Sequence, residues 1–225
     1  MATPLADHRA VRRAHGGTVH DVVMAVLAGA LRSWLQRRGQ RLSAATTVRA
    51  MVPVSVRGRS RAGAGNEISA HLVDLPVGLA DPLARLADVS PPLLHELGAR
   101  VAGRHAGRLY DVLVTTLPGP PRVLYAHGAP LLDLFPMVPL GSGQAVAFGV
   151  VTCAGNADYG ITTDNDAVPD VDALADALRE SLAELVARAG AAARRELMAE
   201  LGLGPGHGTS RSTGSPATAS TDPPV

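Results

Sequence analysis

Apolar and polar positions alternate most regularly in residues 18–38, TVHDVVMAVLAGALRSWLQRR. Apolar residues recur there every three or four positions, in a stripe so wide that little beyond Arg32, Ser33 and Gln36 is left for solvent. No proline interrupts the segment, and Gly39 follows two arginines at its end, as is typical of a helix C-terminus. The pattern predicts a mostly buried helix.

A second apolar stripe of this period, with charged residues opposite, predicts an amphipathic helix over residues 171–189 that packs on a sheet. Asp170 is its predicted N-cap, and Glu184 and Arg188 form a favourable i,i+4 pair. After Gly190 a separate helical piece is predicted up to residue 201. Short helices are also predicted at residues 81–86 and 92–101.

Segments rich in β-branched and apolar residues, bounded by Gly, Pro, Ser or Asn, predict strands. These segments are residues 48–57, 66–77, 110–117, 130–140, 144–152 and 157–162. Strands and helices mixed within about 200 ordered residues predict one α/β domain, over residues 14–201. Residues 1–13 are interpreted as an N-terminal extension. Residues 202–225 lack periodicity and large apolar side chains, which predicts a disordered tail.

Charge and composition exclude several classes of function. All 21 basic residues are arginine, so neither a lysine Schiff base nor a Walker A lysine is available. A net charge of +1 and six aromatic residues argue against nucleic acid as a partner. The longest apolar run, residues 22–31, is short for a membrane span, and no apolar region follows the first arginines. A cytoplasmic protein is expected.

The sequence does not match two common motifs for hydrolysis and metal binding. Ser142 lies in LGSGQ, which does not match GxSxG, and no HExxH is present. The segment TDNDAVPD is expected to be a turn before a helix cap rather than a calcium loop. His71 is expected in a strand, as a core or channel residue. Six other histidines are expected to be solvated: His8, His15, His95, His105, His127 and His207.

His20 and Asp21 form a polar pair at the start of the apolar helix, and three interpretations are open. In the first, Thr18 is the N-cap and Asp21 returns a carboxylate to the cap amide. In the second, the pair faces a cleft and orients a partner group. In the third, His20 is a base that Asp21 orients, although adjacent helical residues point about 100° apart.

Five blocks of the chain together resemble the C-terminal half of bacterial wax ester synthase/diacylglycerol acyltransferases, in order over residues 14–189. The blocks are GGTVHDVVMAVLAGALRSWL, RAMVPVSVR, GNEISAHLVDLPVGLADPLARL, VLVTTLPGPPRVLYAHGAPLLDLFPMVPL and DAVPDVDALADALRESLAEL. The resemblance implies one α/β half, a mixed sheet with packed helices, of the CoA-dependent acyltransferase fold related to chloramphenicol acetyltransferase. Such enzymes move a fatty acyl group from acyl-CoA to a fatty alcohol or diacylglycerol, in a tunnel between two similar halves.

The resemblance also singles out individual positions. Asp21 matches the second residue of the family's Asn-Asp pair, and His20 stands in place of the asparagine. Thr116 stands where the family usually has asparagine, before the matching turn residues Pro118, Gly119 and Pro120. Between residues 86 and 91 the family normally has several more helical turns. Acyl-CoA is implied as a co-substrate, without a resident cofactor or metal.

The family's catalytic motif, HHxxxDG, belongs to its N-terminal half, where the second histidine is the general base. These 225 residues contain no HH pair, so no catalytic residue is identified and activity of the chain alone is not expected. A catalytic N-terminal half, on this or another chain, is the implied partner, and an apolar face should then be exposed beside His20. The alternative is a non-catalytic lipid-binding or structural remnant of the family. Apolar substrates imply peripheral association with membranes or lipid droplets.

Overall fold

The computed structural model describes residues 1–55, 68–89 and 110–201, and centres on a six-stranded mixed sheet in the order β1-β8-β7-β4-β2-β3. β2, β4 and β7 run parallel, whereas β3, β8 and β1 are antiparallel to the strands beside them. The strands are β1 (Ala2–Pro4), β2 (Val48–Ser55), β3 (Ile68–Leu75), β4 (Val112–Pro118), β7 (Val146–Cys153) and β8 (Asn156–Thr163).

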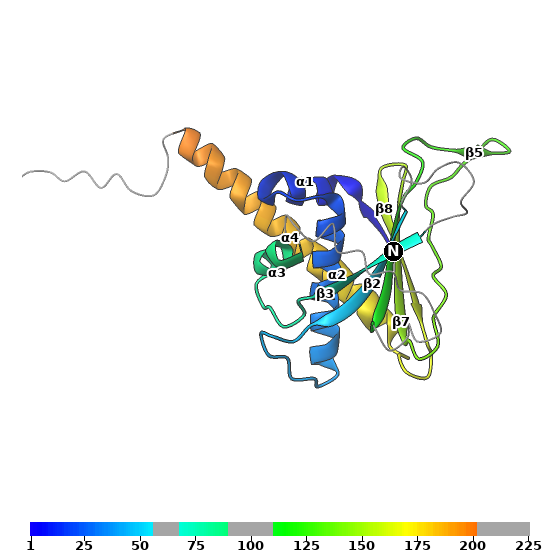
Figure 1. The fold of residues 1–225 in the computed structure, drawn as a ribbon. Helices are drawn as coiled ribbons and strands as arrows, with labels where there is room; N and C mark the ends of the chain where they lie inside the picture. Colours follow the sequence, from blue (N-terminus) through cyan, green and yellow to red (C-terminus); the bar gives the residue numbers. More distant parts are fainter. Residues whose placement is uncertain (56–67, 90–109, 202–225) are drawn as a thin grey trace, which may run out of the picture.

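The helices gather on one side of this sheet (Figure 1). They are α1 (Leu5–His15), α2 (Val19–Arg37), α3 (Pro82–Val89) and α4 (Val171–Glu200). α2 is buried without a break from Asp21 to Leu31, because it packs against α1, α3, α4 and β3. The predicted buried helix at residues 18–38 is therefore confirmed, and so is the α/β class.

Side-chain alternation gives the sheet two different faces. The helix-covered face holds buried apolar residues from five strands: Ala50, Val52, Leu75, Val112, Val114, Phe148, Val150, Ala157 and Tyr159. On the opposite face, residues 131–138, here called the strap, cross β7 and β8. Pro136 of the strap lies so close to β8 that a Cβ on Gly160 would overlap its carbonyl oxygen.

The strand predicted at residues 130–140 is wrong beyond its first residue. Ala129–Pro130 (β6) pairs with Tyr125–Ala126 (β5) in a hairpin, whose turn places His127 and Gly128 at φ of 50° and 81°. The residues that follow form the strap and make no ladder. Pro136 and Pro139 lack the N–H that a strand ladder needs, so the apolar composition alone is misleading.

Two expectations about α4 are also corrected. The helix continues through Gly190 to Glu200 rather than restarting, since Gly190 lies among alanines on an exposed surface. Asp170 is the N-cap residue, as predicted, and its carboxylate accepts hydrogen bonds from Trp34 Nε1 (2.9 Å) and Arg38 (2.8 Å) rather than from the helix backbone. Glu184 pairs with Arg85 of α3, not with Arg188.

Residues 1–13, expected as an extension, are joined to the domain. β1 pairs with β8, and α1 packs against α4. His8, expected to be solvated, is fully buried, with its Nε2 atom 2.7 Å from the hydroxyl of Tyr159. The predicted helix at 92–101, the histidines at 95, 105 and 207, and the tail at 202–225 lie outside the described residues.

Candidate functional site

The start of α2 carries a complete capping box. The Thr18 N–H donates to Asp21 Oδ2 (2.7 Å), and the Asp21 N–H donates to the Thr18 hydroxyl (3.2 Å). The Asp21 carboxylate is buried in this role and fixes where the helix begins. The first interpretation of Asp21 is therefore confirmed.

His20 points to a different partner. Its Nδ1 atom lies 3.3 Å from the hydroxyl of Thr116, on the helix-covered face near the C-terminal end of β4. Both side chains are half-buried. The contact joins two of the positions that the resemblance singled out, 96 residues apart in the chain.

The turn after β4 is held against the end of β7. The Gly119 N–H donates to the hydroxyl of Thr152 (3.3 Å), and a Cβ at Gly119 would overlap the carbonyl oxygen of that residue. Pro118 and Pro120 flank the glycine and end the ladder. The Pro-Gly-Pro turn therefore fixes where the chain leaves the sheet, directly after Thr116 and Leu117.

Large apolar side chains are exposed from the end of β4 through the strap. Leu117, next to Thr116, is 52% exposed, and Met137 is 89% exposed. The other members of this apolar surface are Val123, Leu124, Tyr125, Leu132, Leu134 and Phe135. Such a concentration is typical of an interaction surface. Leu117 follows Thr116 in β4 and therefore points to the face of the sheet opposite to His20.

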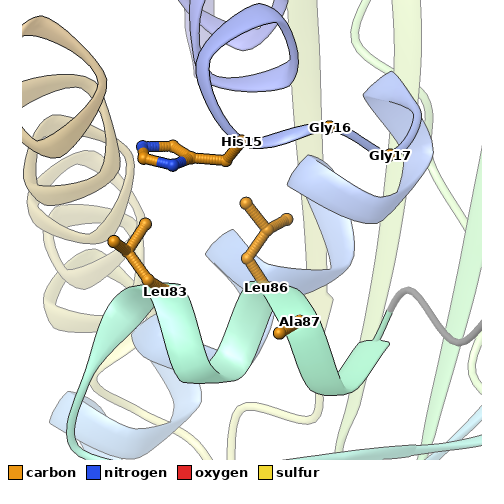
Figure 2. Close-up of a pocket in the computed structure, with 6 residues that line it drawn as sticks. All are labelled: His15, Gly16, Gly17, Leu83, Leu86 and Ala87. Carbon is orange, nitrogen blue, oxygen red and sulfur yellow. The ribbon is translucent and has the colours of Figure 1, made fainter. Parts of the chain in front are cut away.

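A small cavity lies between the residues that precede α2 and helix α3 (Figure 2). Its volume is about 180 Å³, and its lining comprises His15, Gly16, Gly17, Leu83, Leu86 and Ala87. The imidazole of His15 projects over Leu83, and its Nε2 atom is buried without a hydrogen-bond partner. Ligand pockets are usually about 300–1,000 Å³, so this cavity is too small to hold an acyl-CoA.

Other sequence candidates are placed away from this region. His71 is half-buried on β3, opposite Val52, and Asp164 accepts the Asp166 N–H (3.0 Å) in the turn expected before α4. In the described ranges, no three His, Cys, Asp or Glu side chains could hold a metal ion together. In the same ranges, no single helix could cross a membrane; α1 and α2 reach the required length and composition only jointly, with a bend of 101° between them.

Two buried charged residues were not anticipated. Arg85 is 3% exposed and donates to the carbonyls of Leu79 and Ala80 and to Glu184. Asp158 is fully buried on the strap side of β8. Neither residue stands in a motif, and the strand or helix pattern around each gives no sign of its partners. Their contacts could be found only from the fold.

Comparisons with known proteins agree with the resemblance. Residues 89–186 match the sequence profile described as the WS/DGAT C-terminal domain. A probable diacylglycerol O-acyltransferase of Mycobacterium tuberculosis is 31% identical over 210 residues, covering 82% of this chain and 45% of that protein. A putative one from the same species is 27% identical over 217 residues, covering 84% and 43%. The chain thus spans about half the length of the curated relatives it matches.

Solved structures show the same fold. The wax ester synthase/diacylglycerol acyltransferase of Marinobacter aquaeolei matches with a TM-score of 0.67 and 24% identity, over 84% of this chain and 48% of that one. A condensation domain of the enacyloxin polyketide synthase matches with a TM-score of 0.51 and 11% identity, over 82% and 39%. The expected half of a chloramphenicol acetyltransferase-like fold is confirmed. The chain belongs to the wax ester synthase/diacylglycerol acyltransferase family and spans its C-terminal domain.

Proposed function

We propose that this chain is the C-terminal domain of an acyl-CoA-dependent O-acyltransferase that makes triacylglycerols or wax esters. It works with a half that carries HHxxxDG, in the same or another polypeptide. The observation that carries the proposal is the exposed apolar surface from Leu117 to Met137. A domain that evolved to pack on a similar half keeps such a surface at its interface.

In the proposed reaction, a histidine of the HHxxxDG half removes the proton of the acceptor hydroxyl. The hydroxyl oxygen forms an ester bond with the thioester carbonyl carbon of acyl-CoA, the C–S bond breaks, and CoA leaves as the thiol after the proton is returned to sulfur. We assign the base to that half because the 225 residues here contain no HH pair. His20, Thr116 and the turn at Pro118–Pro120 contribute a wall of the tunnel.

The partners follow from this role. Acyl-CoA is the co-substrate, a fatty alcohol or diacylglycerol is the acceptor, and no resident cofactor or metal is needed. We place the protein in the cytoplasm, at the periphery of a membrane or lipid droplet where such acceptors partition.

The proposal is tested by transfer of a radiolabelled acyl group from acyl-CoA to hexadecanol and to dioleoylglycerol. The full chain is assayed alone and co-expressed with the N-terminal half of the mycobacterial relative, intact or with its second motif histidine changed to alanine. We expect product only with the intact half. If the folded chain gives no product in either mixture, the alternative of a non-catalytic lipid-binding or structural remnant is favoured.

A further inference from the structure

Asp158 stands out among the polar residues of the sheet. It lies on β8, pairs with Ala2 and Val151, and points to the face that the strap covers. The side chain is fully buried; its Oδ2 atom accepts the N–H of Leu134 in the strap (2.8 Å), whereas its Oδ1 atom has no hydrogen-bond partner. A buried carboxylate with one unpaired oxygen is costly, so apolar packing alone does not account for it.

Further contacts hold the strap on both sides of Leu134. The Asn156 side-chain amide donates to Asp133 Oδ1 (3.1 Å), and Pro136 and Val138 lie where a Cβ on Gly149 would be. The most exposed strap residues, Leu132, Phe135 and Met137, lie between or beside these points and make no contact of this kind. β7 and β8 thus hold the strap backbone, while the apolar side chains of Leu132, Phe135 and Met137 stay exposed.

We propose that Asp158 is a positioning residue that fixes the strap, so that Leu132, Phe135 and Met137 are presented to the catalytic half. This inference rests on the proposed function for the identity of the partner, but the anchoring itself is a property of the chain alone. Asp158 acts through the Leu134 N–H and contacts no substrate. Burial raises the pKa of its carboxyl group, with the nearby Asp133 adding to the effect.

Anchoring of the strap by Asp158 is tested by amide hydrogen exchange of the full chain and of the variants Asp158→Ala and Asp158→Asn. Alanine removes the acceptor, so exchange of strap residues 131–138 should rise by about tenfold or more. Asparagine keeps an oxygen acceptor and should restore protection to within about threefold of the original chain. Asp164→Ala is the matched control, because it also removes a carboxylate that accepts one backbone N–H, outside the strap.

The effect of Asp158 on association with the catalytic half is tested with the same variants in the reconstituted acyl-transfer assay. Asp158→Ala should raise the concentration of chain that gives half-maximal activity, without changing the maximal rate, and Asp158→Asn should reverse the change. The inference is overturned if Asp158→Ala leaves strap exchange unchanged, if exchange rises equally in α2 and α4, or if Asn behaves like Ala. If exchange behaves as expected but no mixture is active, the anchoring stands and the proposed function fails.

Discussion

The two faces of the sheet are covered by different parts of the chain, and to different extents. The helix-covered face is filled by side chains of this chain, and α2 lies buried among α1, α3, α4 and β3. The strap side is covered over β7 and β8 by an irregular segment, whose large apolar residues remain exposed. We therefore expect the first face to supply the stability of the domain, and we propose that the second face binds the catalytic half.

Truncation of matched apolar residues on the two faces should separate these roles most clearly. Leu178→Ala removes a fully buried side chain of α4, and it should lower the free energy of unfolding by about 2–5 kcal/mol. Met137→Ala, in the strap, should change it by less than about 0.5 kcal/mol. Urea denaturation measures both, and similar losses in the two variants would contradict the division of roles.

A glycine substitution under the strap should have an intermediate effect. In Gly160→Ala the new methyl group meets the carbonyl oxygen of Pro136, so the strap must shift, at a cost of about 1–3 kcal/mol in unfolding free energy. Gly190→Ala is the control, because nothing lies near that position in α4; it should stabilise the chain by about 0.5–1 kcal/mol. A neutral Gly160→Ala would mean that the strap is not seated on β8.

The buried His8 should make the helix-covered side sensitive to acid. Burial lowers the pKa of His8 in the folded chain, so below about pH 6.5 the unfolded chain binds more protons and stability falls. The loss should not exceed about 1.4 kcal/mol per pH unit. Asp158, whose pKa is raised by burial, gives the opposite slope at lower pH. The variant His8→Gln isolates the histidine: its unfolding free energy should lack the decline between pH 6.5 and 5.

The smallest effect is expected at the His20–Thr116 contact. Both residues are half-buried, so the coupling in a double-mutant cycle of His20→Ala and Thr116→Val should be about 0.5–1 kcal/mol of unfolding free energy. Thermal or urea denaturation of the four proteins measures it. Strictly additive effects would show that the hydrogen bond contributes nothing to the folded chain.

Local sequence signals predicted those elements whose ends carry capping residues. Thr18 and Asp21 cap α2, as in one of the three interpretations of the sequence, and the apolar period predicted its buried face. The strap residues were wrongly predicted to form a strand, because apolar composition does not show where proline lacks the N–H that strand pairing needs. The contact of His8 with Tyr159, and that of Asp158 with Leu134, join residues 151 and 24 positions apart. Such partners depend on strand order, which no local pattern encodes.

The contact between His20 and Thr116 is an intermediate case: the sequence singled out the two positions but did not show that they are close. The resemblance singled out both positions, but only the parallel pairing of β2, β4 and β7 brings the end of β4 to the start of α2. The role of Asp21 was one of several open interpretations until its carboxylate was seen at the cap.

The central claim is that the strap side of the sheet is the surface on which a catalytic half completes the enzyme. It is tested most directly by titrating the full chain, or its Phe135→Asp/Met137→Asp variant, against a fixed amount of the HHxxxDG-bearing half and measuring acyl transfer to hexadecanol. We predict activity that depends on the chain and requires at least about tenfold more of the variant, because each charge would have to be buried. Equal titration curves for the two proteins would contradict the claim.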